Sequence, residues 1–155
     1  MKQQLENRMK KTGNYRWEDE KVEEKEVEVK QVSEREIWTG GNRFYFGEDD
    51  IMYVELVGEY DLHGALALRD AYLKLLNNVN GKVNIFVDNS RSGKPSQEAR
   101  KIFAEMIEHE QCGKIAVFGL NPVTRVIASF VLGGGKKKDT QIFKTKDEAL
   151  KWLKE

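Results

Sequence analysis

Asp61, His63 and Ser90 are the side chains whose types would allow nucleophilic catalysis, with a serine nucleophile, a histidine base and an aspartate. An α/β hydrolase presents its serine on a sharp turn with the pattern Gly-x-Ser-x-Gly, and the sequence around Ser90, DNSRSG, lacks that pattern. Asp61 and His63 come instead at the expected start of a helix, where capping or a surface position is the simpler role. We therefore expect no catalytic residues and predict that the chain is not an enzyme.

Metal and phosphate sites also lack the spacing that they need. Cys112 is the only cysteine and the two histidines lie far apart in the sequence, so we expect no metal site and no cofactor. The run GGGKKK at 133–138 contains the residue types of a phosphate-binding loop, but such a loop follows a strand and leads into a helix. This run follows an expected helix and leads into a strand. We interpret it as a helix end and a solvated basic loop, with contact to anionic lipid headgroups as the alternative.

The most informative polar segment follows the strand predicted by the alternating Val83, Ile85 and Val87. Turn-forming residues from Asp88 to Pro95 are expected to end this strand in a loop, and an amphipathic helix is expected from about residue 96 to 110. Ligands of open α/β sheets usually bind where such strands end. We predict a partner- or ligand-binding site there, with a further contribution from the next strand–helix turn: Asp88, Asn89, Ser90, Ser96, Gln97 and Asn121.

The remaining elements predict an α/β fold. A hairpin is expected at 43–57 with its turn at 47–50, followed by a helix to about Asn77 that Asp61 caps and Gly81 closes. After the central strand and helix come a strand at 113–120, a helix that begins after the N-cap Asn121, a strand at 140–143 and a short helix after Thr145. This order favours a mixed sheet, antiparallel at its first hairpin and parallel afterwards.

Length and charge exclude several classes of protein. A chain of 155 residues is long enough for one domain with a real core. Lysine plus arginine and aspartate plus glutamate both number 26, so we expect no nucleic-acid partner. No apolar run is long enough to span a bilayer, and the first residues do not resemble a signal peptide. We expect a cytoplasmic protein that is not transmembrane.

The first 36 residues differ from the rest because about half of them are charged, with both signs mixed. We divide the chain into this N-terminal extension, 1–36, and a domain at 37–155. Two interpretations of the extension stay open. It is either mobile or loosely docked, or it forms an ordered edge strand or helix, for which Val27, Val29 and Val32 give a weak strand signal.

Three segments, VNIFVDNS, KIAVFGLNPVTRVIASFVLG and FKTKDEALKWLKE, resemble the STAS superfamily (sulfate transporter and anti-sigma factor antagonist domains), in its SpoIIAA-like branch of small bacterial proteins. The resemblance covers residues 42–155. It implies a β-α superhelical fold, shared in outline with lipid-binding CRAL-TRIO domains, and a non-enzymatic binding role. The family's phosphorylated serine lies in an Asp-Ser-Ser-Gly motif, and here Ser96 and Gln97 fall on its aspartate and that serine. The motif is absent, so we interpret Ser96 as a helix N-cap.

We therefore predict a non-catalytic, cytoplasmic, STAS-like regulatory module that binds a protein partner through the loop and helix start at 88–98. The alternative is a carrier of an apolar small molecule or lipid between the helices and the sheet. The helix at 122–132 is apolar nearly all round, which favours either a contact between copies of the chain or one wall of an apolar pocket.

Overall fold

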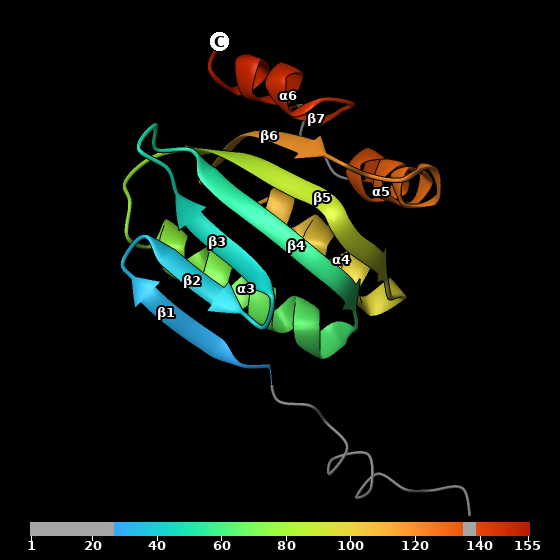
Figure 1. Cartoon of the computed structure of the whole chain (residues 1–155), viewed down its shortest axis with the longest axis horizontal. Coiled ribbons are helices and arrows are strands. Elements are labelled where there is room, and N and C mark those ends of the chain that lie inside the picture. The colour runs from blue at the N-terminus through green and yellow to red at the C-terminus, as the bar shows by residue number, and fades with distance from the viewer. Residues whose placement is uncertain (1–26, 135–138) are drawn as a thin grey trace, which may run out of the picture.

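The computed structural model of this chain describes residues 27–134 and 139–155. A single mixed sheet runs through the described part, with its seven strands in the same order as in the sequence. The first four strands pair antiparallel, and the pairs β4–β5, β5–β6 and β6–β7 are parallel (Figure 1). The predicted mixed sheet is thus confirmed. Its strands are β1 (Val29–Ser33), β2 (Glu36–Thr39), β3 (Asn42–Phe46), β4 (Met52–Tyr60), β5 (Val83–Pro95), β6 (Cys112–Phe118) and β7 (Thr140–Phe143).

Four helices are described, and capping side chains fix where they begin. They are α3 (Leu62–Leu76), α4 (Gln97–Ile107), α5 (Pro122–Gly134) and α6 (Lys146–Leu153). The side-chain oxygens of Asp61, Ser96, Asn121 and Thr145 accept a hydrogen bond from the backbone N–H three residues later, at 2.8, 3.1, 2.8 and 3.2 Å. Each oxygen satisfies a donor that has no partner within its own helix, so the predicted N-caps are confirmed.

The helices cover both faces of the sheet. α3 and α4 lie behind the sheet in Figure 1, and their apolar side chains pack on β2–β6 in the larger core. α6 lies against β5–β7 and buries Ala149 and Leu153 with Phe86 in a second, smaller core. Burial on both faces explains why β6 is apolar from Ile115 to Phe118. Gly81 has the positive φ expected of it, +82°, but α3 ends earlier, with Asn77 as its C-cap.

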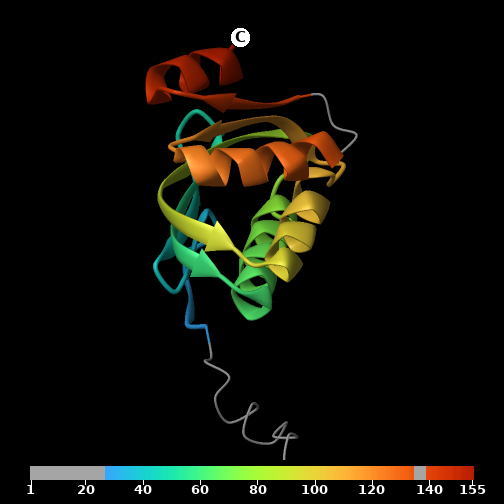
Figure 2. The same ribbon diagram turned by 90° about the vertical axis from the view of Figure 1, so that its right-hand side faces the viewer.

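The loop predicted at 88–95 is wrong, because β5 continues as a strand as far as Pro95. β4 is long enough to pair with it throughout, with Glu55 opposite Asp88 and Tyr60 opposite Pro95. Between those pairs β5 uses more residues than β4, and the register shifts twice. The turn-forming residues therefore form bulges in a strand that stays paired along one edge. Figure 2 shows β4 and β5 curving together toward the helices.

The N-terminal extension is described only from residue 27. There β1 pairs antiparallel with β2 and forms an edge of the sheet, so the weak strand signal at Val29 and Val32 does correspond to a strand. Every residue of β1 is exposed. Residues 1–26 lie outside the described part, as do residues 135–138 of the Gly-Lys run, and the division of the chain at residue 36 stays a prediction.

Candidate functional site

The six predicted site residues lie in two groups along β5. Asp88, Asn89 and Ser90 lie where the pairing of β5 with β6 ends, and Asn121 follows β6 in the turn before α5. Ser96 and Gln97 are at the start of α4, beyond the end of β5. A strand advances by about 3.3 Å per residue. The seven strand residues between Asp88 and Ser96 therefore hold the two groups farther apart than a compact loop would.

The first group is held by local hydrogen bonds. Asp88 Oδ1 accepts from the backbone N–H of Ser90 at 2.9 Å, a local contact that acidic side chains commonly make in turns and bulges. Gly119 has φ of +87°, and a Cβ at this position would lie 2.6 Å from the Ser90 nitrogen. The backbones of β5 and of the β6–α5 turn therefore touch, and Asn121 is fixed beside them by its cap on α5.

Ser96, of the second group, lies at a broad polar depression that Gln97 does not line. Ser96 caps α4, and its backbone N–H donates to the Tyr60 carbonyl at 2.8 Å, which joins the start of α4 to the end of β4. The depression has a volume of about 1020 Å³ and carries both charge signs. Its charged and titratable residues are Glu59, Asp61, His63, Lys94 and Arg100. Cations and carboxylates are mixed, so the depression has no single preferred charge in a ligand.

The geometry does not assemble the triad of Asp61, His63 and Ser90. Asp61 and His63 line the polar depression, and the Asp61 carboxylate accepts from the Gly64 N–H as a cap. Ser90 does not line this depression and lies against Gly119. Among residues 27–134 and 139–155, no three His, Cys, Asp or Glu side chains come together as metal ligands.

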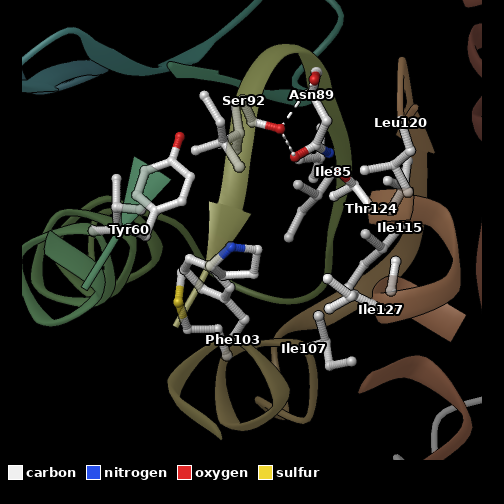
Figure 3. Close-up of a pocket in the computed structure, with 18 of the residues that line it drawn as sticks. Tyr60, Ile85, Asn89, Ser92, Phe103, Ile107, Ile115, Leu120, Thr124 and Ile127 are labelled. Atoms are coloured by element: carbon white, nitrogen blue, oxygen red, sulfur yellow. Dashed lines mark hydrogen bonds between the residues drawn. The ribbon is translucent and has the colours of Figure 1, made fainter. Parts of the chain in front are cut away.

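An apolar pocket of about 160 Å³ lies between the two groups, under the curved part of β5 (Figure 3). β5 contributes Ile85 at its floor and Asn89 and Ser92 at one end, α4 contributes Phe103, and α5 contributes Ile127. The Phe103 ring meets Tyr60 edge-on, with ring centroids 5.6 Å apart. Leu68 and Tyr72 of α3 line it as well, so three helices face the sheet across the pocket, which stays partly open to solvent.

The hydroxyl groups of the pocket are used within the protein. Tyr60 donates its O–H to Asn42 Oδ1 at 3.0 Å, and Thr124 Oγ1 donates to Asn121 Oδ1 at 2.9 Å. Burial raises the pKa of Tyr60 well above its usual range, so its phenol stays protonated at neutral pH. Tyr72 hydrogen-bonds Cys112 and the Met106 carbonyl. The walls therefore present mainly hydrocarbon and aromatic surface to an occupant.

The site residues chosen from the sequence include Asn89 but none of the apolar pocket lining. The apolar excess of the 122–132 helix is the sequence feature that could have identified more of the pocket lining. In the structure Ile127 and Ala128 of this helix line the pocket, whereas Val123 and Val126 are 66% and 58% exposed. Arg125, on the same helix, donates from Nη2 to the Leu120 carbonyl at 3.4 Å.

A sequence profile described as "Domain of unknown function (DUF7793)" matches residues 45–155. The chain belongs to this family. The DUF7793 match begins within β3 and includes β4, β5, α6 and every pocket-lining residue except Phe44. No curated protein sequence matches the chain.

Solved structures place this DUF7793 chain in a known fold. An uncharacterized protein of the DUF3478 family from Shewanella loihica PV-4, described as having a SpoIIAA-like fold, aligns with a TM-score of 0.54 and 15% identity over 73% of this chain and 92% of its own. The anti-sigma factor antagonist SpoIIAA in its unphosphorylated form and the Bacillus cell fate determinant SpoIIAA in its phosphorylated form each align with a TM-score of 0.47 and 14% identity. They cover 83% and 81% of this chain and 98% and 97% of their own. The expected SpoIIAA-like fold is confirmed.

Proposed function

We propose that this protein is a non-catalytic, cytoplasmic regulatory module that binds a protein partner through residues 88–98. The observation that supports this most is the open edge of β5. Pairing of β5 with β6 ends at Asp88 and Phe118, whereas pairing with β4 continues to Pro95. In the part of the chain that the structure describes, no strand pairs with the other edge of 89–95. An open edge offers backbone donors and acceptors to an extended segment of a partner.

Polar side chains on both sides of this edge support the same surface. Ser90 and Gln97 are exposed, and Asp88 and Asn89 are half-buried beside them. The two helix starts contribute less than expected, because the Ser96 and Asn121 side chains already accept first-turn N–H groups. The partner's contacts are therefore proposed mainly along the strand edge, with Asp88 and Gln97 at its ends.

Quantitative pull-down from extract tests this surface. We expect the double variant Asp88→Lys/Gln97→Lys to lose a partner that the wild type retains. The variant Gln31→Lys/Glu34→Lys is the matched control, because it also replaces one amide and one carboxylate side chain with lysine, at exposed residues in and next to β1. The control should retain the partner. Identical partner sets for the wild type and the 88/97 variant would refute the proposal.

The apolar pocket favours a second candidate function, which is carriage of an apolar small molecule between the helices and the sheet. Its volume and lining suit a small apolar occupant better than a polar one. Native mass spectrometry of freshly purified protein tests this candidate. A copurifying apolar compound supports carriage, and a chain at its bare mass argues against it.

A further inference from the structure

We propose that the apolar pocket binds a compact molecule of single-ring size that carries one hydrogen-bond acceptor, with the acceptor placed at Asn89. This inference rests on the second candidate function and names the chemical class of its ligand. Its test is separate from that of the partner surface, although the two share Asn89.

The size of the pocket limits its occupant. An apolar cavity of about 150 Å³ binds benzene and stays free of water. The pocket here measures about 160 Å³, so it accommodates one aromatic ring or a branched aliphatic group of similar volume. The long acyl chains of a phospholipid exceed this volume several-fold. The volume therefore favours a compact ligand over a lipid.

The chemistry of the walls favours an apolar occupant over water. A buried water needs two to four polar partners. The Tyr60 and Thr124 hydroxyls already donate to Asn42 and Asn121, at 3.0 and 2.9 Å. Ile85, Phe103 and Ile127 surround the centre of the pocket and offer no hydrogen bonds (Figure 3).

The polar end of the pocket sets the orientation of the ligand. Ser92 Oγ donates its one hydrogen between two oxygens of Asn89, the backbone carbonyl oxygen at 2.9 Å and the side-chain oxygen at 3.0 Å. With the side-chain oxygen turned toward Ser92, the Nδ2 group of Asn89 is the hydrogen-bond donor at this end of the pocket. Because an amide N–H donates, the matching ligand group is an acceptor such as a carbonyl oxygen. Figure 3 shows Asn89 and Ser92 together at this end, with the apolar side chains below.

The test uses two probes of nearly equal shape, acetophenone and α-methylstyrene, which differ by a carbonyl oxygen in place of a methylene group. Each is titrated into the full-length ¹⁵N-labelled chain, and amide chemical shifts are followed. We expect saturable shifts for both probes at pocket residues such as Ile85, Phe103 and Ile127. In Asn89→Ala, acetophenone should lose roughly fivefold in affinity relative to α-methylstyrene, since a neutral hydrogen bond contributes about that factor.

Two variants that fill the pocket from opposite walls, Ala128→Phe and Val87→Leu, should weaken both probes. Ser129→Leu adds a large side chain to an exposed position on the same helix, α5, and should leave binding unchanged. The spectrum of each variant without probe shows whether it is folded, and Val87→Leu is the milder change.

Four outcomes would overturn the proposal. They are no saturable shifts at the pocket with either probe, shifts that the filling variants do not weaken, equal losses for the two probes in Asn89→Ala, or pocket shifts that depend on protein concentration without probe. The last would assign the pocket to a second copy of the chain. If a lipid copurifies and neither probe binds, carriage stays supported and the compact ligand is refuted. Loss of the partner in the 88/97 pull-down would not change the outcome of the probe titrations.

Discussion

Ser96 shows how one side chain decides between two interpretations of the same position. The resemblance to anti-sigma factor antagonists placed Ser96 and Gln97 on a phosphorylation motif that this sequence lacks. In the structure the Ser96 hydroxyl oxygen accepts from the Ala99 N–H at 3.1 Å, which is the geometry of an N-cap. The same residue fixes the direction in which α4 leaves β5, because its own N–H bonds the Tyr60 carbonyl.

Replacing Ser96 with alanine removes the cap from α4. We expect Ser96→Ala to lower the free energy of unfolding by about 1 kcal/mol, because one first-turn N–H loses its partner. Urea denaturation measures this change. Ser90→Ala, at an exposed position on β5, is the control and should stay within about 0.5 kcal/mol of the wild type. Equal stability of the two variants would contradict the capping role.

Gly119 holds the contact between β5 and the β6–α5 turn. Its φ of +87° is unfavourable for any side chain, and a Cβ would lie 2.6 Å from the Ser90 nitrogen. We expect Gly119→Ala to destabilise the protein by about 1–3 kcal/mol in urea denaturation. Gly41→Ala is the matched control, because its Cβ would meet Val57 at an ordinary 3.7 Å. A Gly119→Ala variant as stable as Gly41→Ala would show that this contact is not tight.

Glu36 makes the stability of the β2–β3 pair depend on pH. Two hydrogen bonds from Arg43, at 3.0 and 3.1 Å, and one from Trp38 Nε1 lower the pKa of Glu36 below its usual value. A lowered folded-state pKa stabilises the protein above the unfolded value of about 4.5, and this stabilisation is lost as the pH falls through the folded-state pKa. Arg43 also stacks over Tyr45, 3.9 Å from the ring centroid.

We therefore expect Glu36→Gln to be less stable than the wild type by about 1 kcal/mol at neutral pH. The difference should shrink as the pH falls below about 4.5 and through the lowered pKa of Glu36, because the wild-type carboxylate then becomes protonated. Urea denaturation at a series of pH values measures it. A difference that stays constant down to low pH would contradict the ionised Glu36–Arg43 pair.

At the scale of elements, the helices were predictable because their signals are local. Capping residues and apolar periodicity lie within a few positions of each helix start, so α3, α4, α5 and α6 begin where the sequence predicts. The path of β5 was not predictable in this way. Asp88, Asn89 and Gly93 favour turns, and only the distant partner β4, which continues to Tyr60, holds them in a strand.

The same reasoning explains the candidate site. The polar residues at 88–98 could be chosen from sequence because they follow a recognisable buried strand. The apolar helix at 122–132 was expected to form either a contact between copies or one wall of an apolar pocket, and its Ile127 and Ala128 do line the pocket. The rest of the pocket could not be chosen, because its walls also come from the sheet and two other helices, and ordinary core residues such as Ile85 and Phe103 form most of it. The space between the sheet and these helices exists only because β4 and β5 curve.

β1 provides a prediction at this scale. A chain that begins at residue 27 retains β1, whereas one that begins at residue 37 loses β1 together with Glu36 and its bonds to Arg43. We expect the first truncation to keep the free energy of unfolding within about 0.5 kcal/mol of the full chain and the second to lose at least about 1 kcal/mol. Urea denaturation of the three proteins measures this. Equal stability of all three would support a domain boundary at residue 36.

At the scale of the whole molecule, the fold combines an antiparallel part and a parallel part in one sheet, and β4 is the strand that joins them, antiparallel to β3 and parallel to β5. No helix in the described ranges is long and apolar enough to span a bilayer. The proposed partner surface and the proposed ligand pocket share the stretch of β5 at 89–95, because Asn89, Ser92, Gly93 and Pro95 also line the pocket. They are separate proposals, and each has its own test.

Amide hydrogen exchange tests the central proposal most directly. The exchange of the chain alone is compared with that of the chain in the complex recovered by pull-down. We predict that binding slows exchange at residues 89–95 and at the start of α4, because a partner covers the open edge of β5. Unchanged exchange at 89–98, with protection confined to β1 or α6, would contradict the proposed surface.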